Sequence, residues 1–536
     1  MFFRAAILFS FCFTAVHATW SPDVNLSPAQ VDFDMQDVAV NSSGDAVAVW
    51  DFYNGSKTEL WSSFYDAASQ TWSPEVQVTA PFDSAGGFPY PISVGFNDNR
   101  IAVVSFPALL SGRSCILSST YSGGIWSVPQ TISDPTQSSF QNVLTMNNSG
   151  QVVVSFFLDS SNAAINVSSN NGGSWLPSPI AVTSDNSVNN VSSSLNSTGN
   201  ALIVWDSQSG GLYSIKYAIY NFPAGLGSTN QVTSLASNFY RPSVSYNAAG
   251  QAVAGFADQS TGGAYVSLFD GVSWSITPTS LSTLPINDNY STAVAMNGLG
   301  EALVVWREFQ PVTGLSLLNV ASFDGNFSSP TWSTATTLSD PTRNASPNYH
   351  ITTHVVTLDD AGNGVVIWDE TTTASHSFTY LPQASTLQGG VWSPFQILSD
   401  ISITDSNPVP RVGLGAETAI ALWPAFDGTN YYEQASTFPF SSSPAQNLSG
   451  SQKSSEFPFQ KVFFNKLQWS ASSSTSVVAY NVYRDGTLIG TVPVGEPLEF
   501  TDSQIQLKTT YTYSVRAVDS SGAASTPISI TIYPKN

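Results

Sequence analysis

The sequence predicts an all-β fold in which a small four-stranded sheet recurs around a closed ring, followed by a separate β-sandwich. Three observations support this prediction. The 536 residues are 42% hydrophobic and 12% aromatic, which is enough apolar material for a large core. Only 10% of the residues are charged, and the abundance of Ser, Thr, Asn and Gly suits turn-rich β-structure. One turn-and-strand motif also recurs at intervals of about 50 residues.

Residues 1–18 have the features of a secretory signal peptide. Arg4 precedes an apolar stretch over 5–16, and small residues around Ala18 predict cleavage there. No later stretch offers about 20 consecutive apolar residues, so we expect no membrane span. The sequence therefore predicts a secreted protein, whether extracellular, periplasmic or associated with a cell surface. The mature chain then keeps one cysteine, Cys115, which we expect to be a buried strand residue.

The repeated motif has the form Asn-x-x-Gly-x-Ala-Val-x-Val-Trp and ends on a closing aromatic residue. Its best copies cover 41–50, 196–205, 247–256 and 297–306, and weaker copies end at Phe106, Phe156, Trp368 and Trp423. The eight closing aromatics predict eight units, with a ring of seven as the alternative. Each unit reads as four alternating strands separated by Gly, Asn and Asp turns.

Such units are typical of the blades of a β-propeller, because one small sheet cannot bury both of its faces alone. Closing the ring also removes exposed sheet edges. A second tryptophan series predicts nine outermost strands for eight blades. Either residues 20–27 or residues 444–449 should therefore complete the last blade, leaving the other segment displaced.

The turn Ser168-Ser169-Asn170-Asn171-Gly172-Gly173-Ser174-Trp175 resembles the Asp-box of sialidase-like (BNR-type) propellers, with Asn in place of Asp. In that family the Asp-box is a structural turn that joins the third and fourth strands of a blade. The resemblance therefore implies architecture and no particular activity. It favours a β-propeller over 19–449.

After a Ser-rich linker over 450–456, the segment 457–536 resembles a fibronectin type III domain. Trp469 matches the core tryptophan of the second strand of that family, and Tyr511 matches its tyrosine corner. The resemblance implies an immunoglobulin-like sandwich. Such modules usually serve as spacers or binding surfaces.

Charge and motifs exclude several functional classes. The formal net charge is −21 and no Lys/Arg cluster occurs, which argues against binding nucleic acid or anionic lipid. No glycine-rich phosphate loop, nucleophile elbow or calcium loop is present, so no cofactor is expected. His350 and His354 sit four apart on a predicted strand, hence more than about 10 Å from each other, and no metal site is predicted.

Propeller ligands commonly occupy one mouth of the central channel, at loops that enter the innermost strands or join second to third strands. In the register of the repeat, polar residues just after the closing aromatic and residues that enter innermost strands face this mouth. The ligand-binding candidates are therefore Asp51, Asp206, Tyr240, Arg241, Tyr290, Arg307, Glu308, Tyr349, Asp369 and Arg411.

A sialidase would need three arginines on a carboxylate, a Tyr–Glu nucleophile pair and an aspartic acid/base. Tyr240-Arg241-Pro242 resembles the Phe/Tyr-Arg-Ile-Pro motif of that family, but it lacks the Ile and falls in the fifth unit instead of near the start. The leading hypothesis is therefore a non-catalytic recognition or adhesion protein that binds a glycan or an extracellular protein. A sialidase-like glycoside hydrolase and a structural envelope protein remain alternatives, and the oligomeric state stays open.

Overall fold

The computed structural model describes residues 19–534, apart from 31–34, 85–90, 160–163, 184–187, 234–237, 259, 276, 283–291, 311–314, 341–348, 375–376, 400–402, 405–408, 416–417, 441, 443, 458–459, 473, 475–476, 520–523 and 526. The described chain is all-β, and none of its residues lies in a helix. Accordingly, no helix that could cross a membrane is present in these ranges.

Eight antiparallel sheets follow one another along residues 24–439, and we number them 1 to 8. In each sheet of the first half, the first four strands pair in chain order. Sheet 1 contains β2 (Gln36–Val40), β3 (Ala46–Tyr53), β4 (Thr58–Asp66), β5 (Thr71–Trp72) and β6 (Val76–Gln77). Sheet 2 contains β7 (Ser93–Phe96), β8 (Ala102–Leu110), β9 (Arg113–Ser122), β10 (Ile125–Trp126) and β11 (Gln130–Thr131). Sheet 3 contains β12 (Ser138–Met146), β13 (Gln151–Asp159), β14 (Ala164–Asn171) and β15 (Ile180–Ala181). Sheet 4 contains β16 (Val188–Leu195), β17 (Asn200–Ser209), β18 (Leu212–Asn221), β19 (Gly225–Leu226) and β20 (Asn230–Gln231).

The second half continues the same order until the last sheet. Sheet 5 contains β21 (Phe239–Tyr246), β22 (Ala252–Asp258), β23 (Gly263–Phe269) and β24 (Thr279–Ser280). Sheet 6 contains β25 (Ala293–Met296), β26 (Ala302–Gln310), β27 (Leu315–Phe323) and β28 (Thr336–Thr337). Sheet 7 contains β29 (Tyr349–Leu358), β30 (Gly364–Ala374), β31 (Ser377–Gln388), β32 (Val391–Trp392), β33 (Gln396–Ile397) and β34 (Ile403–Thr404). Sheet 8 contains β35 (Arg411–Gly415), β36 (Thr418–Phe426), β37 (Tyr431–Pro439) and, from the other end of the chain, β1 (Val24–Asn25).

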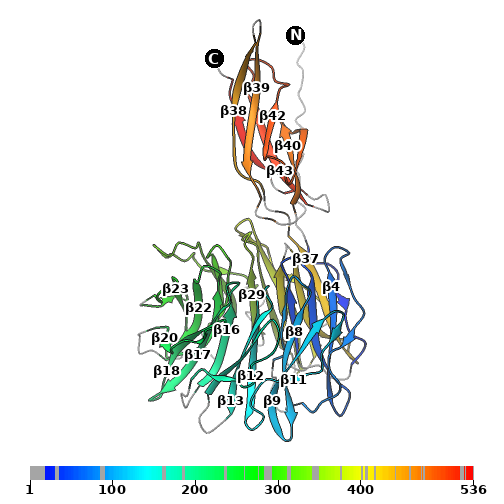
Figure 1. Cartoon of the computed structure of the whole chain (residues 1–536), viewed down its shortest axis with the longest axis vertical. Helices are drawn as coiled ribbons and strands as arrows, with labels where there is room; N and C mark the ends of the chain where they lie inside the picture. Colours follow the sequence, from blue (N-terminus) through cyan, green and yellow to red (C-terminus); the bar gives the residue numbers. More distant parts are fainter. Residues whose placement is uncertain are drawn as a thin grey trace.

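These sheets form a closed ring. The first strand of each sheet contacts the first strand of the next, and β35 of sheet 8 contacts β2 of sheet 1. Figure 1 shows the sheets standing side by side around the ring. Residues 20–27, and not 444–449, complete the last sheet, because Val24 pairs with Ala435 and the Ser21 N–H donates to the Thr437 oxygen at 2.8 Å. The two ends of the ring segment therefore share one sheet.

Two further sheets follow the ring. One has the order β38 (Gln446–Phe457), β39 (Gln460–Ser470), β42 (Glu499–Asp502), and the other has the order β41 (Thr487–Pro493), β40 (Val477–Arg484), β43 (Tyr511–Asp519), β44 (Ile528–Ile532). Figure 1 shows them standing beyond one face of the ring.

The expected linker over 450–456 is wrong, because these residues lie inside β38. Gly450 pairs with Leu467, and Ser454 pairs with Phe463. Ser and Gly in this stretch resemble a linker by composition. In the structure, however, the apolar neighbouring strand β39 supplies the hydrogen-bonding partners that make the stretch a strand.

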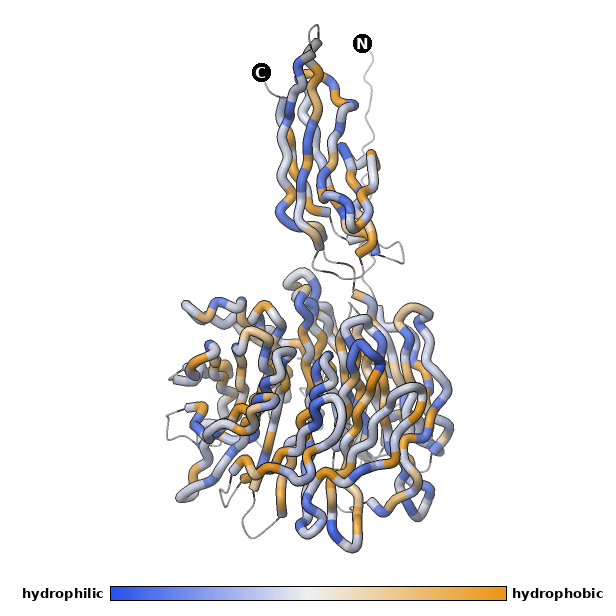
Figure 2. Tube along the Cα trace, in the orientation of Figure 1, coloured by the Kyte–Doolittle hydropathy of each residue, from blue (hydrophilic) through white to orange (hydrophobic). Residues whose placement is uncertain are grey.

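The core lies between neighbouring sheets of the ring. Each closing aromatic packs in a cluster that it shares with the preceding sheet, and Figure 2 shows hydrophobic residues recurring along the ring strands. Their side chains are at most 1% exposed: Trp50, Phe106, Phe156, Trp205, Phe256, Trp306, Trp368 and Trp423. Burial of each such side chain contributes about 1.5–3 kcal/mol to the packing between neighbouring sheets. Cys115 is buried in the same way, as expected.

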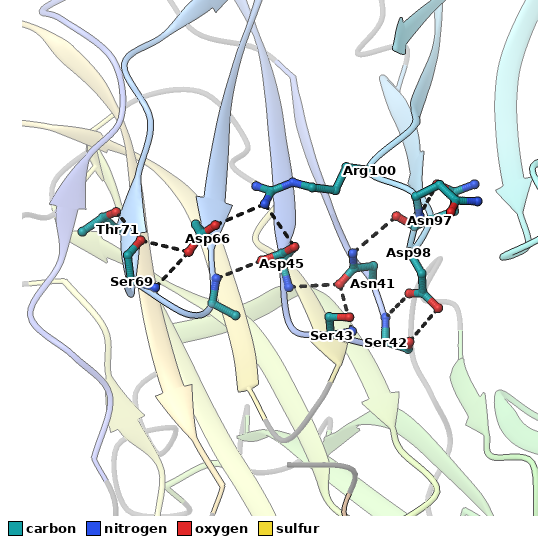
Figure 3. Close-up of polar contacts among 12 residues, drawn as sticks. Asn41, Ser42, Ser43, Asp45, Asp66, Ser69, Thr71, Asn97, Asp98 and Arg100 are labelled. Carbon is teal, nitrogen blue, oxygen red and sulfur yellow. Dashed lines mark hydrogen bonds and ion pairs between the residues drawn. The ribbon is translucent and has the colours of Figure 1, made fainter. Parts of the chain in front are cut away.

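The Asn-x-x-Gly part of the motif forms the turn between the first and second strands. Asn41 Oδ1 accepts from the Ser43 and Asp45 N–H groups, both at 3.0 Å, and Gly44 has a φ of 83° that favours glycine. Asn41 Nδ2 also donates to the main-chain oxygen of Asn97 in sheet 2, at 3.3 Å (Figure 3). The asparagine thus shapes its own turn and holds the next sheet.

The same link recurs around much of the ring. The Nδ2 groups of Asn147, Asn196, Asn247 and Asn297 each donate to a main-chain oxygen of the following turn, at 3.0–3.3 Å. In the seventh turn the equivalent residue is Asp359, whose ionised carboxylate has no N–H to donate. Between sheets 8 and 1 the backbones approach directly, because a Cβ on Gly415 would lie 2.0 Å from the Asn41 oxygen.

These turns define the two faces of the ring. We call "turn face" the side that carries the turns joining first to second and third to fourth strands, and "mouth face" the opposite side. β37 is the third strand of sheet 8, so it runs from the mouth face at Tyr431 to the turn face at Pro439. Because β38 begins at Gln446, the two C-terminal sheets join the ring on its turn face.

Candidate functional site

Asp206 follows the closing aromatic of sheet 4 and lies at the mouth-face end of β17. Its side chain is fully buried. Oδ1 accepts from the Asn189 and Asn190 N–H groups at 3.1 and 2.9 Å, while Oδ2 accepts from Asn190 Nδ2 at 2.8 Å and from the Arg241 N–H at 2.9 Å. The register of β16 against β17 shifts between Val188 and Val191. The carboxylate therefore binds the N–H groups that this β-bulge leaves without a ladder partner.

Two other predicted carboxylates have the same place and the same role. Asp369 Oδ1 accepts from the Thr353 N–H at 2.7 Å and from its hydroxyl, beside a register shift in β29. Asp51 Oδ1 accepts from the Met35 N–H at 2.9 Å. Both side chains are buried. These carboxylates thus fasten the first strand of their own sheet at the mouth face.

Arg307 and Glu308 follow the closing aromatic of sheet 6, and both are buried. Arg307 donates through Nη1 to the main-chain oxygen of Ile351 in sheet 7, at 2.6 Å. Glu308 Oε1 accepts from Trp306 Nε1 at 3.0 Å. These two charged groups therefore take part in contacts within and between neighbouring sheets.

Arg411 begins β35 and lies in the inner layer of the ring. Its Nε is 3.6 Å from Asp37 Oδ1 in sheet 1, and Asp37 Oδ2 accepts from the Val94 N–H of sheet 2 at 2.9 Å. Burial raises the pKa of the Asp37 carboxyl, and the Arg411 guanidinium opposes that rise. The pair thus connects sheets 8, 1 and 2, close to the junction of sheets 8 and 1, where no asparagine side chain of the repeated turn bridges the two sheets in the part of the chain that the structure describes.

Tyr240 and Arg241 lie where β21 enters the ring from the mouth face. The Arg241 guanidinium carbon is 5.9 Å from the centroid of the Tyr240 ring, and the Tyr213 ring lies 6.3 Å from Tyr240 at 41°. All three side chains are partly exposed. Together they form a small aromatic–arginine surface across sheets 4 and 5, which we call the tyrosine–arginine group.

The backbone of this group is held in an unusual conformation. Arg241 has a φ of 53°, in the left-handed region that residues with a Cβ rarely adopt. Its N–H is bound by Asp206, and the Tyr213 N–H donates to Asn238 Oδ1 at 2.9 Å. The surrounding structure thus holds the strained backbone of Arg241 in place.

The predicted candidates are brought together only in part. Asp206, Tyr240 and Arg241 lie together, whereas Arg307 and Arg411 make their contacts with sheets 7 and 1. Tyr290 falls outside the described residues, and so does the side chain of Tyr349, whose backbone is in β29. Sequence reasoning missed Tyr213, although its place just after the turn glycines Gly210 and Gly211 was a signal for a mouth-face residue. Within the described residues, no group of three His, Cys, Asp or Glu side chains is arranged to hold a metal ion.

No protein-family model matches the chain, and no curated protein matches its sequence. Solved structures that are similar include an α-L-arabinanase from Penicillium chrysogenum, with 11% identity over 54% of this chain and 94% of its own, at a TM-score of 0.34. A PL25 ulvan lyase is 9% identical over 77% of this chain and 94% of its own, with a TM-score of 0.37. A Hadza microbial sialidase is 14% identical over 62% of this chain and 74% of its own, with a TM-score of 0.34. At these scores the likeness assigns neither a family nor an activity.

Proposed function

We propose that the chain is an exported, non-catalytic recognition protein that binds a glycan at the mouth face through the tyrosine–arginine group. The supporting observation is the set of partly exposed rings of Tyr213 and Tyr240 with the Arg241 guanidinium held beside them. Aromatic faces stack on the apolar faces of sugar rings, and an arginine adds donors for hydroxyl or carboxylate groups. The backbone contacts of this group preorganise it, which lowers the entropic cost of binding.

The non-catalytic part of the proposal is supported by three mouth-face aspartates whose carboxylate oxygens accept hydrogen bonds from the protein. Asp51, Asp206 and Asp369 accept hydrogen bonds from main-chain N–H groups of their own sheets. A catalytic acid or nucleophile needs an oxygen directed at substrate. The guanidinium groups of Arg307 and Arg411 contact sheets 7 and 1, and that of Arg241 lies over the Tyr240 ring, which differs from a three-arginine clamp on one carboxylate.

As architecture, we propose an eight-bladed propeller of the sialidase-like type that carries a fibronectin type III module. The eight sheets arranged in a closed ring, with β1 completing the last of them, support the propeller. For the second part, the C-terminal sheets have three and four strands, Trp469 is buried against Tyr480, and the Tyr511 hydroxyl accepts from the Gln506 N–H at 2.9 Å. That last bond has the form of a tyrosine corner. Joined on the turn face, the module would leave the mouth face open.

The test is binding of the mature protein to a glycan array, followed by titration of the best ligand. Arg241→Gly is the informative variant, because glycine adopts a φ of 53° without strain and keeps the N–H that Asp206 binds. We expect Arg241→Gly and Tyr240→Ala each to weaken binding about 10-fold or more. Arg100→Gly is the matched control, since Arg100 also has a positive φ, of 57°, but lies on the turn face.

Two results would contradict the proposal. Turnover of fluorogenic glycosides by the wild type, abolished in Asp206→Asn, would establish the hydrolase alternative. Absence of any array ligand, together with capture of a protein partner that survives Arg241→Gly, would remove the glycan from the proposed function.

A further inference from the structure

An open pocket of about 470 Å³, which we call the cavity, lies between sheets 1 and 2, toward the outer strands and away from the mouth-face site. Phe64, Glu75 and Val76 line it from sheet 1 and the segment beside β5, and Arg100 and Tyr121 line it from sheet 2. Its volume is within the range of pockets that hold small ligands or a single side chain.

One wall of the cavity is aromatic and held in place. The Phe64 and Tyr121 ring centroids are 4.3 Å apart, and Trp126 lies 5.4 Å from Tyr121. Trp126 Nε1 donates to Ser62 Oγ of sheet 1 at 3.0 Å, so the wall is fastened across both sheets. The negative faces of such rings attract a cation.

Glu75 and Arg100 are the charged residues among those lining the cavity, and two carboxylates outside the lining pair with Arg100. Arg100 Nη1 is 3.1 Å from Asp66 Oδ2 and 3.4 Å from Asp45 Oδ2, as Figure 3 shows. Glu75 lines the cavity, and in the described part of the chain it makes no ion pair; burial raises the pKa of its carboxyl. Three carboxylates against one guanidinium leave two negative charges in excess when all are ionised.

Arg100 departs from the repeat at this place. The fourth position of the turn is glycine with positive φ in six other copies, which are Gly44, Gly150, Gly199, Gly250, Gly300 and Gly362. Arg100 instead adopts a φ of 57° with a full side chain. Its contacts with Asp45 and Asp66 of sheet 1 explain how the strained backbone is held, and they place the guanidinium at the cavity.

We propose that this cavity receives the side chain of a lysine or arginine from a protein partner. The aliphatic stem would pack on Phe64, Tyr121 and Val76, and the cationic head would reach Glu75. The net excess of two negative charges around Glu75 and Arg100 would attract that cationic head. The net charge of −21 attracts basic surfaces in general, and this cavity gives them a specific point of attachment.

The experiment uses the mature full-length protein and two capped tripeptides that differ only at the centre, lysine in one and norleucine in the other. Chemical-shift changes in a methyl-labelled sample report weak binding at millimolar peptide. We expect the lysine peptide to bind at least about 10-fold more tightly, with affinity that falls as salt is raised. Glu75→Gln should abolish the preference for lysine. Glu59→Gln, a change on the same sheet outside the cavity lining, should leave it unchanged.

Tyr121→Leu provides a second variant, which keeps apolar volume and removes the aromatic face; it should weaken the lysine peptide about 3-fold or more and the norleucine peptide little. Titration with glucosamine tests whether the ammonium group comes from an amino sugar instead of a peptide. Equal binding of the two peptides, lysine preference that survives Glu75→Gln, or binding of glucosamine without the lysine peptide would overturn the proposal.

Discussion

The side-chain amide of Asn196 donates a hydrogen bond to the main-chain oxygen of Asn247 at 3.0 Å, and thereby joins sheet 4 to sheet 5. Both groups are buried, and Asn196 Oδ1 is simultaneously bound to the N–H groups of its own turn. One side chain thus couples a local conformation to a contact between sheets.

Asn196→Asp tests this coupling. The carboxylate keeps the acceptor for the turn but sets a second oxygen against the Asn247 carbonyl, so a buried bond becomes a repulsion. We expect a loss of about 1–3 kcal/mol in the free energy of unfolding, measured with urea. Asn326→Asp is the control, because Asn326 is an exposed turn residue; an equal loss there would contradict the coupling.

Gly415→Ala tests the close approach between sheets 8 and 1. The new Cβ would meet the Asn41 oxygen at 2.0 Å, which the structure can accommodate only by moving one backbone. We expect destabilisation of about 1–3 kcal/mol, seen as a lower midpoint of thermal unfolding. Gly173→Ala adds the same methyl group where nothing lies within 4 Å, and it should leave the midpoint nearly unchanged.

Glu433 predicts an inverted pH dependence of stability. Its side chain is fully buried on β37, and burial together with the charge of Asp51 holds the pKa of this carboxyl well above its usual 4.5. Above the unfolded-state value, the folded chain therefore binds more protons than the unfolded chain. This contribution reduces stability as pH rises from about 4.5 through the raised folded pKa.

Glu433→Gln replaces the titrating carboxyl group with a neutral amide. It should increase the free energy of unfolding at neutral pH and change it little at pH 4. Urea titrations at a series of pH values measure the difference. Glu496→Gln, at an exposed position, is the reference variant. A constant offset between wild type and Glu433→Gln across the series would argue against a raised pKa.

The Asp37–Arg411 pair predicts a second pH effect, of the same sense, because burial also raises the pKa of the Asp37 carboxyl. Arg411→Met leaves the Asp37 carboxylate without the guanidinium that opposes its burial. Because the cost of burying the Asp37 charge without its guanidinium partner grows as pH rises, the variant should lose more stability at pH 7 than at pH 4. Asp37→Asn should remove most of the further cost of Arg411→Met, which a double-mutant cycle would measure. Simple additivity of the two changes would show that the pair is not coupled.

Much of the ring could be predicted because its signals are local. The asparagine turn and the closing aromatic recur in the sequence, and in the structure the motif over 196–205 contains the turn that precedes β17 and the buried Trp205. The strand β38 could not be distinguished from a linker by sequence. Its Ser-rich stretch has no strand pattern of its own, and it is a strand because it pairs with β39.

The roles of the mouth-face carboxylates were also beyond the sequence. Asp206 lies at the mouth-face end of β17, but its role as a main-chain acceptor depends on a bulge in β16 that no residue pattern marks. The contact of Tyr213 with Tyr240 joins residues of different sheets, so only the ring geometry reveals it.

The pairing of Val24 with Ala435 has a consequence for how the chain is made. The closing strand leaves the ribosome first, yet its hydrogen-bonding partner is produced more than 400 residues later. Sheets 1 to 7 are synthesised while one side of sheet 1 still exposes the apolar surface around Trp50. Completion of the ring is thus a late event, and a cell that makes this protein must keep that surface from self-association until Ala435 is synthesised.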